Sequence, residues 1–165
     1  MFKNLFVKPE QKIAKILIEK NLTVSTAESC TGGLISSRLT DISGSSAYIK
    51  ENYVTYANEA KQKILNVSEE TLTVHGAVSE QCAKEMAQGL FEQAKCDIAL
   101  CITGIAGPTG GTKEKPVGTV FISIKNKDLL IVKKFEINPK YSRTKMKYVF
   151  SQKALECLLK FLQNL

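Results

Sequence analysis

The feature that most limits the fold is an almost wholly apolar run at residues 97–103, Asp-Ile-Ala-Leu-Cys-Ile-Thr. A strand with one solvated face alternates polar and apolar side chains, whereas an uninterrupted apolar run is typical of a strand buried on both faces. A glycine-rich segment at 104–112, Gly-Ile-Ala-Gly-Pro-Thr-Gly-Gly-Thr, follows at once. The run therefore predicts the central strand of a sheet that helices cover on both sides.

The rest of the sequence alternates between helical and strand periodicity. Further strands are predicted at 22–26, 49–56, 117–124 and 129–137, and helices at 9–20, at 31–39, from Asn58, after Ser79 and from near Ser142. Helices alternate with strands in the first part of the chain, and two strands are adjacent in the last part. This order predicts an α/β fold, a three-layer α/β/α sandwich with a mixed, mostly parallel sheet. The length predicts one domain over residues 1–165.

Composition excludes several classes of protein. No apolar run approaches the roughly 20 residues that a membrane span needs, and the start at 1–12 lacks the apolar region of a signal peptide, so we expect a cytoplasmic protein. The chain has five cysteines, no Cys-x-x-Cys and one histidine, His75, so we expect reduced thiols and no zinc site. His75 precedes a predicted helix without a Gly-x-Ser-x-Gly motif, so a turn role is expected rather than a catalytic triad.

The net charge of +7 is unevenly distributed. Residues 1–111 carry a net charge of −1, whereas residues 112–165 carry +8. A solvated, lysine-rich face and a surface that attracts an anionic ligand are both compatible with this pattern. Nucleic acid is not an expected partner, because no basic motif interleaved with aromatic residues occurs.

Two junctions between a strand and a loop are unusual in composition. Ligands of open α/β sheets gather at the carboxyl ends of strands, where both junctions are predicted to lie. In the first, at 27–33, the glycines permit close backbone approach, and the next helix start is expected to offer free N–H groups to an anion. The second, at 103–111, lacks the Gly-Lys-Ser/Thr ending of a P-loop but is expected to face a ligand.

A serine-rich segment and one lysine are the candidates for nucleophilic chemistry. Ser46 lies among serines and glycines at 41–48, where a turn or capping role is an equally good interpretation. Asn58 is the predicted N-cap of a helix, which places Lys61 at the third helical position, where a capping box carries Glu or Gln. The positive helix end and burial would both favour a neutral amine, which a serine needs as its general base. A solvated lysine is the alternative.

These segments also occur together in a characteristic order. The segments TAESCTGG (26–33), GSSAY (44–48), VTYANEAK (54–61), HGAVSE (75–80), TGIAGPTGG (103–111) and EKPVGTV (114–120) resemble the CinA C-terminal domain family in its stand-alone form. The resemblance covers roughly residues 8–163. It implies a nicotinamide-nucleotide amidohydrolase that converts nicotinamide mononucleotide to nicotinate mononucleotide and ammonia with a Ser/Lys dyad and neither metal nor cofactor.

The resemblance also implies roles for single residues. Ser46 corresponds to the nucleophile and Lys61 to the base, Tyr56 would help to orient them, and Ser29 is the reserve nucleophile, which the sequence does not separate from Ser46. Arg143, at the start of the last helix, would hold the substrate phosphate. The residues implied to line the nucleotide site and to supply oxyanion donors are Glu28, Thr31, Gly32, Thr103 and Gly104.

The same resemblance implies which ligand the protein binds and that it forms an oligomer. We expect a small pyridine mononucleotide as the ligand and a homo-oligomer, most simply a dimer. A non-catalytic nucleotide-binding or regulatory domain of the competence/damage-inducible type remains the alternative function.

Overall fold

The structure, a computed structural model, describes residues 8–165, so part of the segment on which the signal-peptide prediction rests lies outside it. Five strands form one sheet in the order β2-β1-β3-β4-β5. Their bounds are Val24–Glu28 (β1), Ile49–Val54 (β2), Ile98–Gly104 (β3), Thr119–Lys125 (β4) and Leu130–Glu136 (β5). The helices are Pro9–Glu19 (α1), Leu34–Thr40 (α2), Asn58–Leu65 (α3), Glu69–Val74 (α4), Glu80–Ala94 (α5) and Arg143–Gln163 (α6), with a 3-10 turn at Ser45–Ala47.

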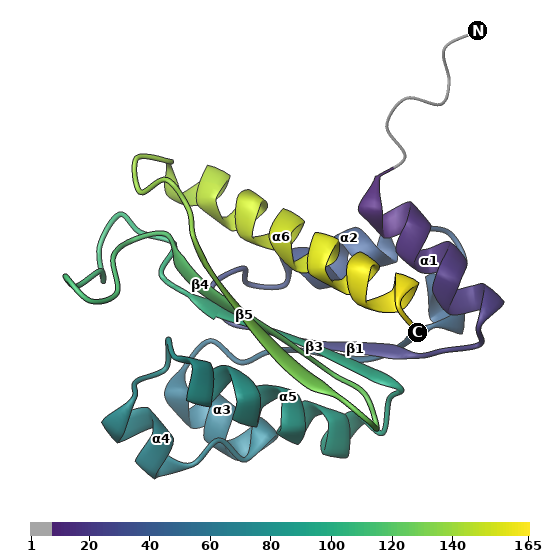
Figure 1. Cartoon of the computed structure of the whole chain (residues 1–165), viewed down its shortest axis with the longest axis horizontal. Coiled ribbons are helices and arrows are strands. Elements are labelled where there is room, and N and C mark those ends of the chain that lie inside the picture. Colours follow the sequence, from purple (N-terminus) through teal and green to yellow (C-terminus); the bar gives the residue numbers. More distant parts are fainter. Residues whose placement is uncertain (1–7) are drawn as a thin grey trace, which may run out of the picture.

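The helices form two layers on the sheet. Helices α1, α2 and α6 cover one face, and α3, α4 and α5 cover the other (Figure 1). Strand β1 pairs in parallel with β2 and β3, whereas β4 pairs antiparallel with β3 and β5. The predicted α/β sandwich with a mixed sheet is therefore confirmed, with β4 alone running against the other strands.

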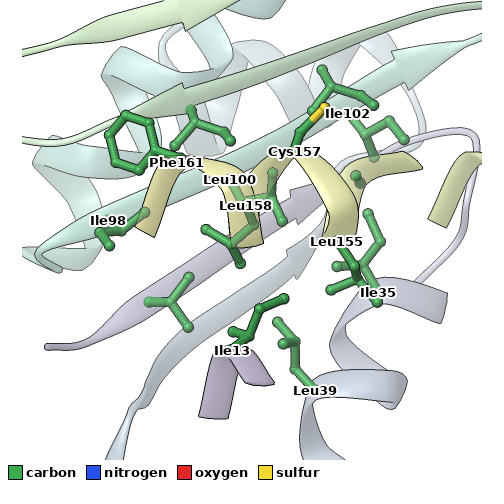
Figure 2. Close-up of a cluster of buried hydrophobic side chains, with 14 of the residues drawn as sticks. Ile13, Ile35, Leu39, Ile98, Leu100, Ile102, Leu155, Cys157, Leu158 and Phe161 are labelled. Carbon is green, nitrogen blue, oxygen red and sulfur yellow. The ribbon is translucent and has the colours of Figure 1, made fainter. Parts of the chain in front are cut away.

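Strand β3 shows why the apolar run lies at the centre of the sheet. Its side chains alternate between two cores: Ile98, Leu100 and Ile102 face α6 and α1, and Ala99 and Cys101 face α5. Figure 2 shows the larger side chains packed against α6. Burial of a Leu or Ile side chain contributes about 1.5–3 kcal/mol, so this strand anchors both layers to the sheet.

Three parallel strands bring distant parts of the sequence to one edge of the sheet. Strands β2, β1 and β3 are neighbours and run in the same direction, so their carboxyl ends meet. The segments that follow these ends contain Ser29, Thr55 and the glycine-rich loop after Gly104. The fold therefore brings both predicted strand-to-loop junctions together.

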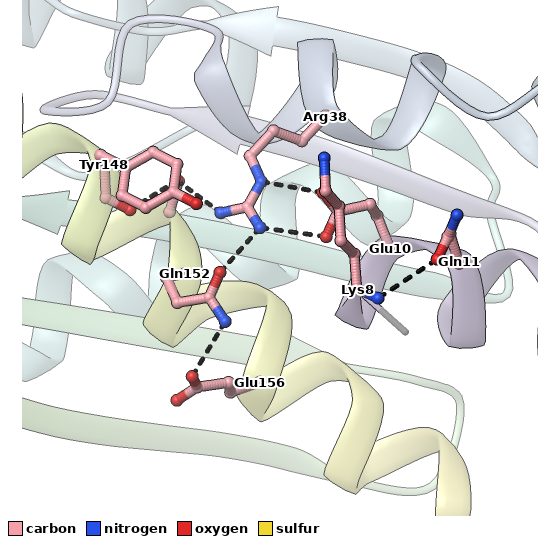
Figure 3. Close-up of polar contacts among 8 residues, drawn as sticks. Lys8, Glu10, Gln11, Arg38, Tyr148, Gln152 and Glu156 are labelled. Atoms are coloured by element: carbon pink, nitrogen blue, oxygen red, sulfur yellow. Dashed lines mark hydrogen bonds and ion pairs between the residues drawn. The ribbon is translucent and has the colours of Figure 1, made fainter. Parts of the chain in front are cut away.

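A buried ion pair joins the three helices on one face. The Arg38 guanidinium on α2 lies 3.0 Å from the Glu10 carboxylate on α1, and both side chains are less than 10% exposed. It also donates to Ser151 Oγ at 3.0 Å and to Gln152 Oε1 at 2.7 Å, both on α6, and lies over the Tyr148 ring (Figure 3). These contacts fix the position of α2 relative to α6.

Replacing Arg38 should destabilise the fold strongly. In Arg38→Met the Glu10 carboxylate stays buried without its cation, so we expect a loss of about 3–5 kcal/mol in the free energy of unfolding. Urea denaturation measures this loss. Lys153→Gln, which breaks the exposed pair with Glu156, is the control and should cost less than about 1 kcal/mol. Equal losses in the two variants would contradict the role given to Arg38.

Candidate active site

The turn after β1 is organised by the carboxylate of Glu28, which is fully buried. One oxygen accepts from Thr31 Oγ1 at 2.6 Å and from the N–H groups of Gly33 and Ile35. The other accepts from the N–H and the hydroxyl of Ser36, both at 2.7 Å. Glu28 thus occupies the donors that α2 was expected to offer to an anion, and both the Glu28 carboxylate and the Thr31 hydroxyl are engaged inside the protein.

Lys61 and Ser29 meet beyond the carboxyl ends of β1 and β2. Lys61 is 1% exposed, and its Nζ lies 3.2 Å from Ser29 Oγ. The same nitrogen lies 2.9 Å from the carbonyl oxygen of Thr55 and 3.1 Å from that of Tyr56. Within residues 8–165, Lys61 has no carboxylate partner. The amine therefore has three neutral oxygen neighbours and no counter-ion.

Burial lowers the pKa of Lys61, because it disfavours the charged amine. Ionised Cys82, Cys30 and Glu59 would each oppose this effect. However, burial raises the pKa of Cys82 to about 11 and that of Cys30 to about 12. At neutral pH both thiols are therefore uncharged, and the shift of Lys61 toward the neutral amine is left opposed mainly by Glu59.

The predicted start of α3 is wrong by one residue. The N-cap is Ala57 and not Asn58, which makes Lys61 the fourth helical residue and not the third. Its N–H donates to the Ala57 carbonyl at 3.2 Å, and its side chain extends back toward residues 55 and 56. Burial, and not a place in a capping box, is the leading cause of its lowered pKa.

The structure does not bring Ser46 to Lys61. Ser46 is exposed in the 3-10 turn before β2, whereas Ser29 follows the carboxyl end of the parallel strand β1. The two serines therefore lie at opposite ends of the parallel strands, about 16 Å apart along the strand direction, which is the length of the five residues of β1. A dyad of Ser46 with Lys61 is therefore ruled out by geometry, and the reserve candidate Ser29 takes its place beside the lysine.

The side chains of Tyr56 and Arg143 contact each other at this edge of the sheet. Arg143, the first residue of α6, donates to the Tyr56 hydroxyl at 3.0 Å and to the Gly107 carbonyl at 2.8 Å. The Tyr56 side chain is 60% exposed, while its carbonyl accepts from Lys61. Arg143 thus joins the glycine-rich loop to the segment that positions Lys61.

The second junction contributes less than predicted. Thr103 is 1% exposed, and its hydroxyl donates to the Ala77 carbonyl at 2.7 Å. A side chain at Gly104 would meet the Thr119 carbonyl oxygen at 2.8 Å, so the glycine is needed for the approach of β4. Thr103 and Gly104 therefore have structural roles in the packing of β3 against its neighbours, and their predicted role in substrate binding stays a prediction.

Two backbone donors lie next to Ser29. Within residues 8–165, the N–H groups of Cys30 and Thr31 donate to no protein acceptor, whereas the N–H of Gly32 donates to the Ser29 carbonyl at 3.1 Å. Free N–H groups beside a nucleophile are the usual donors of an oxyanion hole. In the described part of the chain, no group of three or more His, Cys, Asp or Glu side chains is arranged to hold a metal ion.

Two hollows differ in their relation to this site. A groove of about 380 Å³ runs between the turn at Gly32 and the first turns of α6, where Thr144 and Lys147 line it. A larger hollow of about 570 Å³, next to Leu22 and Asp97, lies at the opposite edge of the sheet. None of the predicted site residues lines the larger hollow, so we assign the chemistry to the edge that holds Ser29.

The comparison with known proteins identifies the family of this chain. A profile of the CinA C-terminal domain matches residues 7–162. The chain belongs to the CinA family. The CinA-like protein of Syntrophotalea carbinolica is 46% identical over 153 residues, which are 93% of this chain and 37% of that protein. The CinA-like protein of Chloroherpeton thalassium is 58% identical over 115 residues, 70% of this chain and 27% of that protein. The chain thus spans about a third of these CinA-like proteins.

Solved structures of CinA proteins share the fold. A competence/damage inducible protein from Agrobacterium tumefaciens superposes with a TM-score of 0.88 at 41% identity, covering 95% of this chain and 98% of that one. A CinA superfamily protein from Klebsiella pneumoniae gives a TM-score of 0.90 at 32% identity, covering 95% and 97%. Within residues 8–165 of this CinA-family chain, no helix has the length and apolar character of a membrane span.

Removing the charge of Glu28 should loosen the turn that carries Ser29. In Glu28→Gln an amide NH₂ group faces N–H and hydroxyl donors, and each buried donor left without an acceptor costs about 1–3 kcal/mol. We therefore expect a loss of at least about 2 kcal/mol in the free energy of unfolding, measured by urea denaturation. Glu19→Gln, at an exposed position on α1, should change it by less than about 0.5 kcal/mol. A Glu28→Gln protein as stable as this control would show that the carboxylate does not organise the turn.

Proposed function

We propose that this protein hydrolyses the carboxamide of nicotinamide mononucleotide, with Ser29 as the nucleophile and Lys61 as its general base. The observation that carries the proposal is the contact of 3.2 Å between the buried amine of Lys61 and the hydroxyl of Ser29. A lysine without a counter-ion and with a lowered pKa is suited to remove the proton from a serine.

The other two contacts of Lys61 favour the orientation that a base needs. A neutral amine has two N–H bonds and one lone pair. The carbonyl oxygens of Thr55 and Tyr56 can only accept, so they take the two N–H bonds. The lone pair is then left for the third neighbour, Ser29 Oγ at 3.2 Å, so in the neutral form of Lys61 the Ser29 hydroxyl would be the donor of this contact.

The proposed reaction has two halves. Lys61 takes the Ser29 proton while Ser29 Oγ attacks the carboxamide carbon, and the N–H groups of Cys30 and Thr31 bind the oxyanion that forms. The Lys61 ammonium then returns the proton to the departing nitrogen, and ammonia leaves an acyl ester on Ser29. Water attacks this ester with Lys61 again as the base, which releases nicotinate mononucleotide and restores the Ser29 hydroxyl.

The choice of substrate rests on the CinA resemblance and on the charge around the site. The mononucleotide is anionic, and the basic residues of the last third of the chain include Arg143 and Lys147 beside Ser29. Arg143 holds Tyr56 and Gly107 and so shapes the rim of the site. The contact of Ser29 with Lys61, which lies next to Tyr56, favours an enzyme over a binding module without activity.

Serine replacements separate the two candidate nucleophiles. In Ser29→Ala we expect ammonia release from nicotinamide mononucleotide to fall by at least about 10³-fold, because no covalent intermediate can form. Ser46→Ala, at the opposite end of the sheet, should keep near-normal activity and is the matched control. An ammonia-release assay with nicotinamide and glutamine as further amides measures both effects. The assignment to Ser29 fails if the Ser46 variant is the inactive one.

The rate should depend on pH through Lys61. The neutral amine is the active form, so kcat/KM should rise tenfold per pH unit while Lys61 is protonated and level off above its pKa. Because burial lowers that pKa, the midpoint should lie below the usual lysine value of about 10.4. Lys61→Arg, which stays charged, should show no such rise and should lose about 10²–10⁴-fold in rate at the pH where the wild-type rate is level. A midpoint at or above about 10.4 would contradict Lys61 as the base.

A further inference from the structure

The groove beside Ser29 contains a cation that the proposed chemistry does not use. It lies between the turn at Gly32 and Gly33 and the first two turns of α6, and its volume is about 380 Å³. Of the residues that line it, Lys147 alone is charged, and no carboxylate faces it. Within residues 8–165, the hydroxyls of Ser37 and Thr144 in this groove have no hydrogen-bond partner. The groove therefore offers one positive charge and free hydroxyls.

The ammonium of Lys147 is held over the glycine turn. The side chain is half-buried, and its Nζ lies 3.4 Å from the place that a Cβ on Gly32 would take. Gly32 has a φ of +63°, in the left-handed region that favours glycine, so this floor of the groove stays free of side-chain atoms. Lys147 forms no ion pair with any carboxylate of the described residues.

Two other groups that were expected to bind an anion already make contacts within the protein. Arg143 donates through both of its terminal nitrogens, to Gly107 and to Tyr56. The N–H groups of Ile35 and Ser36 at the start of α2 donate to Glu28. Lys147 lines the groove and forms no ion pair within residues 8–165, so it is the cation of this groove that can meet a ligand.

We propose that this groove binds the phosphate of the substrate, with Lys147 as its cation and Ser37 and Thr144 as hydroxyl donors. The proposal rests on the proposed function, and it replaces Arg143 as the predicted phosphate ligand. Gly32 lies three residues after Ser29 and bonds to its carbonyl, so the groove begins next to the nucleophile. A molecule with a carboxamide at one end and a phosphate at the other would span the two sites.

Binding without turnover provides the test. In a Ser29→Ala background, Lys147→Gln should raise the Kd for nicotinamide mononucleotide at least tenfold by calorimetry, and Lys147→Arg should restore most of the affinity. The Kd for nicotinamide riboside, which has no phosphate, should stay the same. With Ser29 intact, Lys147→Gln should raise KM at least tenfold and leave kcat within about threefold, since it removes a binding contact that the transition state does not strengthen.

A matched charge change controls for long-range electrostatics. Lys160→Gln removes the same charge from the same helix, about 20 Å further along its axis, where salt screens the interaction. It should leave every constant unchanged. If Lys147→Gln leaves KM and Kd unchanged, or weakens the riboside and the mononucleotide equally, the phosphate assignment is overturned.

A second probe separates this inference from the proposed function. Ribose 5-phosphate carries the phosphate but no carboxamide, so its binding does not depend on any amidase activity. If the wild-type protein releases no ammonia yet binds ribose 5-phosphate through Lys147, the function fails and the phosphate groove stands. If ribose 5-phosphate does not bind, or binds equally well to Lys147→Gln, the groove assignment fails whatever the activity.

Discussion

The site depends on the way in which the buried charge of Glu28 is compensated. A carboxylate inside a protein is costly unless it is fully hydrogen-bonded or paired with a cation. Five donors from the turn and from the start of α2 compensate this one, and no cation takes part. The backbone carbonyl of Glu28 accepts from Thr55, whose own carbonyl accepts from Lys61. Glu28 thus shapes the turn of Ser29 while its carboxylate leaves the nearby lysine unpaired.

This separation of charges determines what Lys61 can do. An ion pair with Glu28 would favour the ammonium form and raise the pKa of the lysine. With only carbonyl and hydroxyl oxygens around it, burial acts in the opposite direction and lowers that pKa. The sheet makes the arrangement possible, because β1 and β2 are parallel neighbours and their carboxyl ends supply the serine and the carbonyls side by side. The burial that makes the ammonium form of Lys61 costly is thus also what favours its neutral amine.

The sequence predicted the parts of this structure that depend on local patterns. The apolar run of β3 predicted a strand buried on both faces, and helical spacing predicted most helices. The order of strands and helices predicted the mixed sandwich. Lys61, Tyr56 and Arg143 were predicted from the resemblance, and the structure brings them together. The start of α3 was missed by one residue, because no side chain caps that helix and the sequence therefore carries no clear signal.

The parts that the sequence did not predict depend on contacts between distant segments. Ser46 and Ser29 are both serines near glycines, and only the strand directions place one beside Lys61 and the other at the far end of the sheet. The resemblance implied that Glu28 lines the nucleotide site, whereas its carboxylate points inward and accepts from the turn and from the start of α2. This orientation depends on hydrogen bonds to residues 31–36, which the sequence alone does not reveal. Lys147 belongs to a basic segment in which any lysine was a candidate, and only the packing of α6 against Gly32 distinguishes it.

Three basic residues near this edge of the sheet differ in burial and in hydrogen-bond partners, and each environment suits a different role. Lys61 is buried without a counter-ion, so its charge is unstable and its amine can accept a proton. Arg143 is always charged, and its fork of donors joins two loop segments, which a single ammonium could not do with the same geometry. Lys147 is half-buried and forms no ion pair within residues 8–165, which leaves it free to bind an anion. The buried Arg38 network holds α2 against α6 one turn further along and so keeps this third cation beside the turn that carries Ser29.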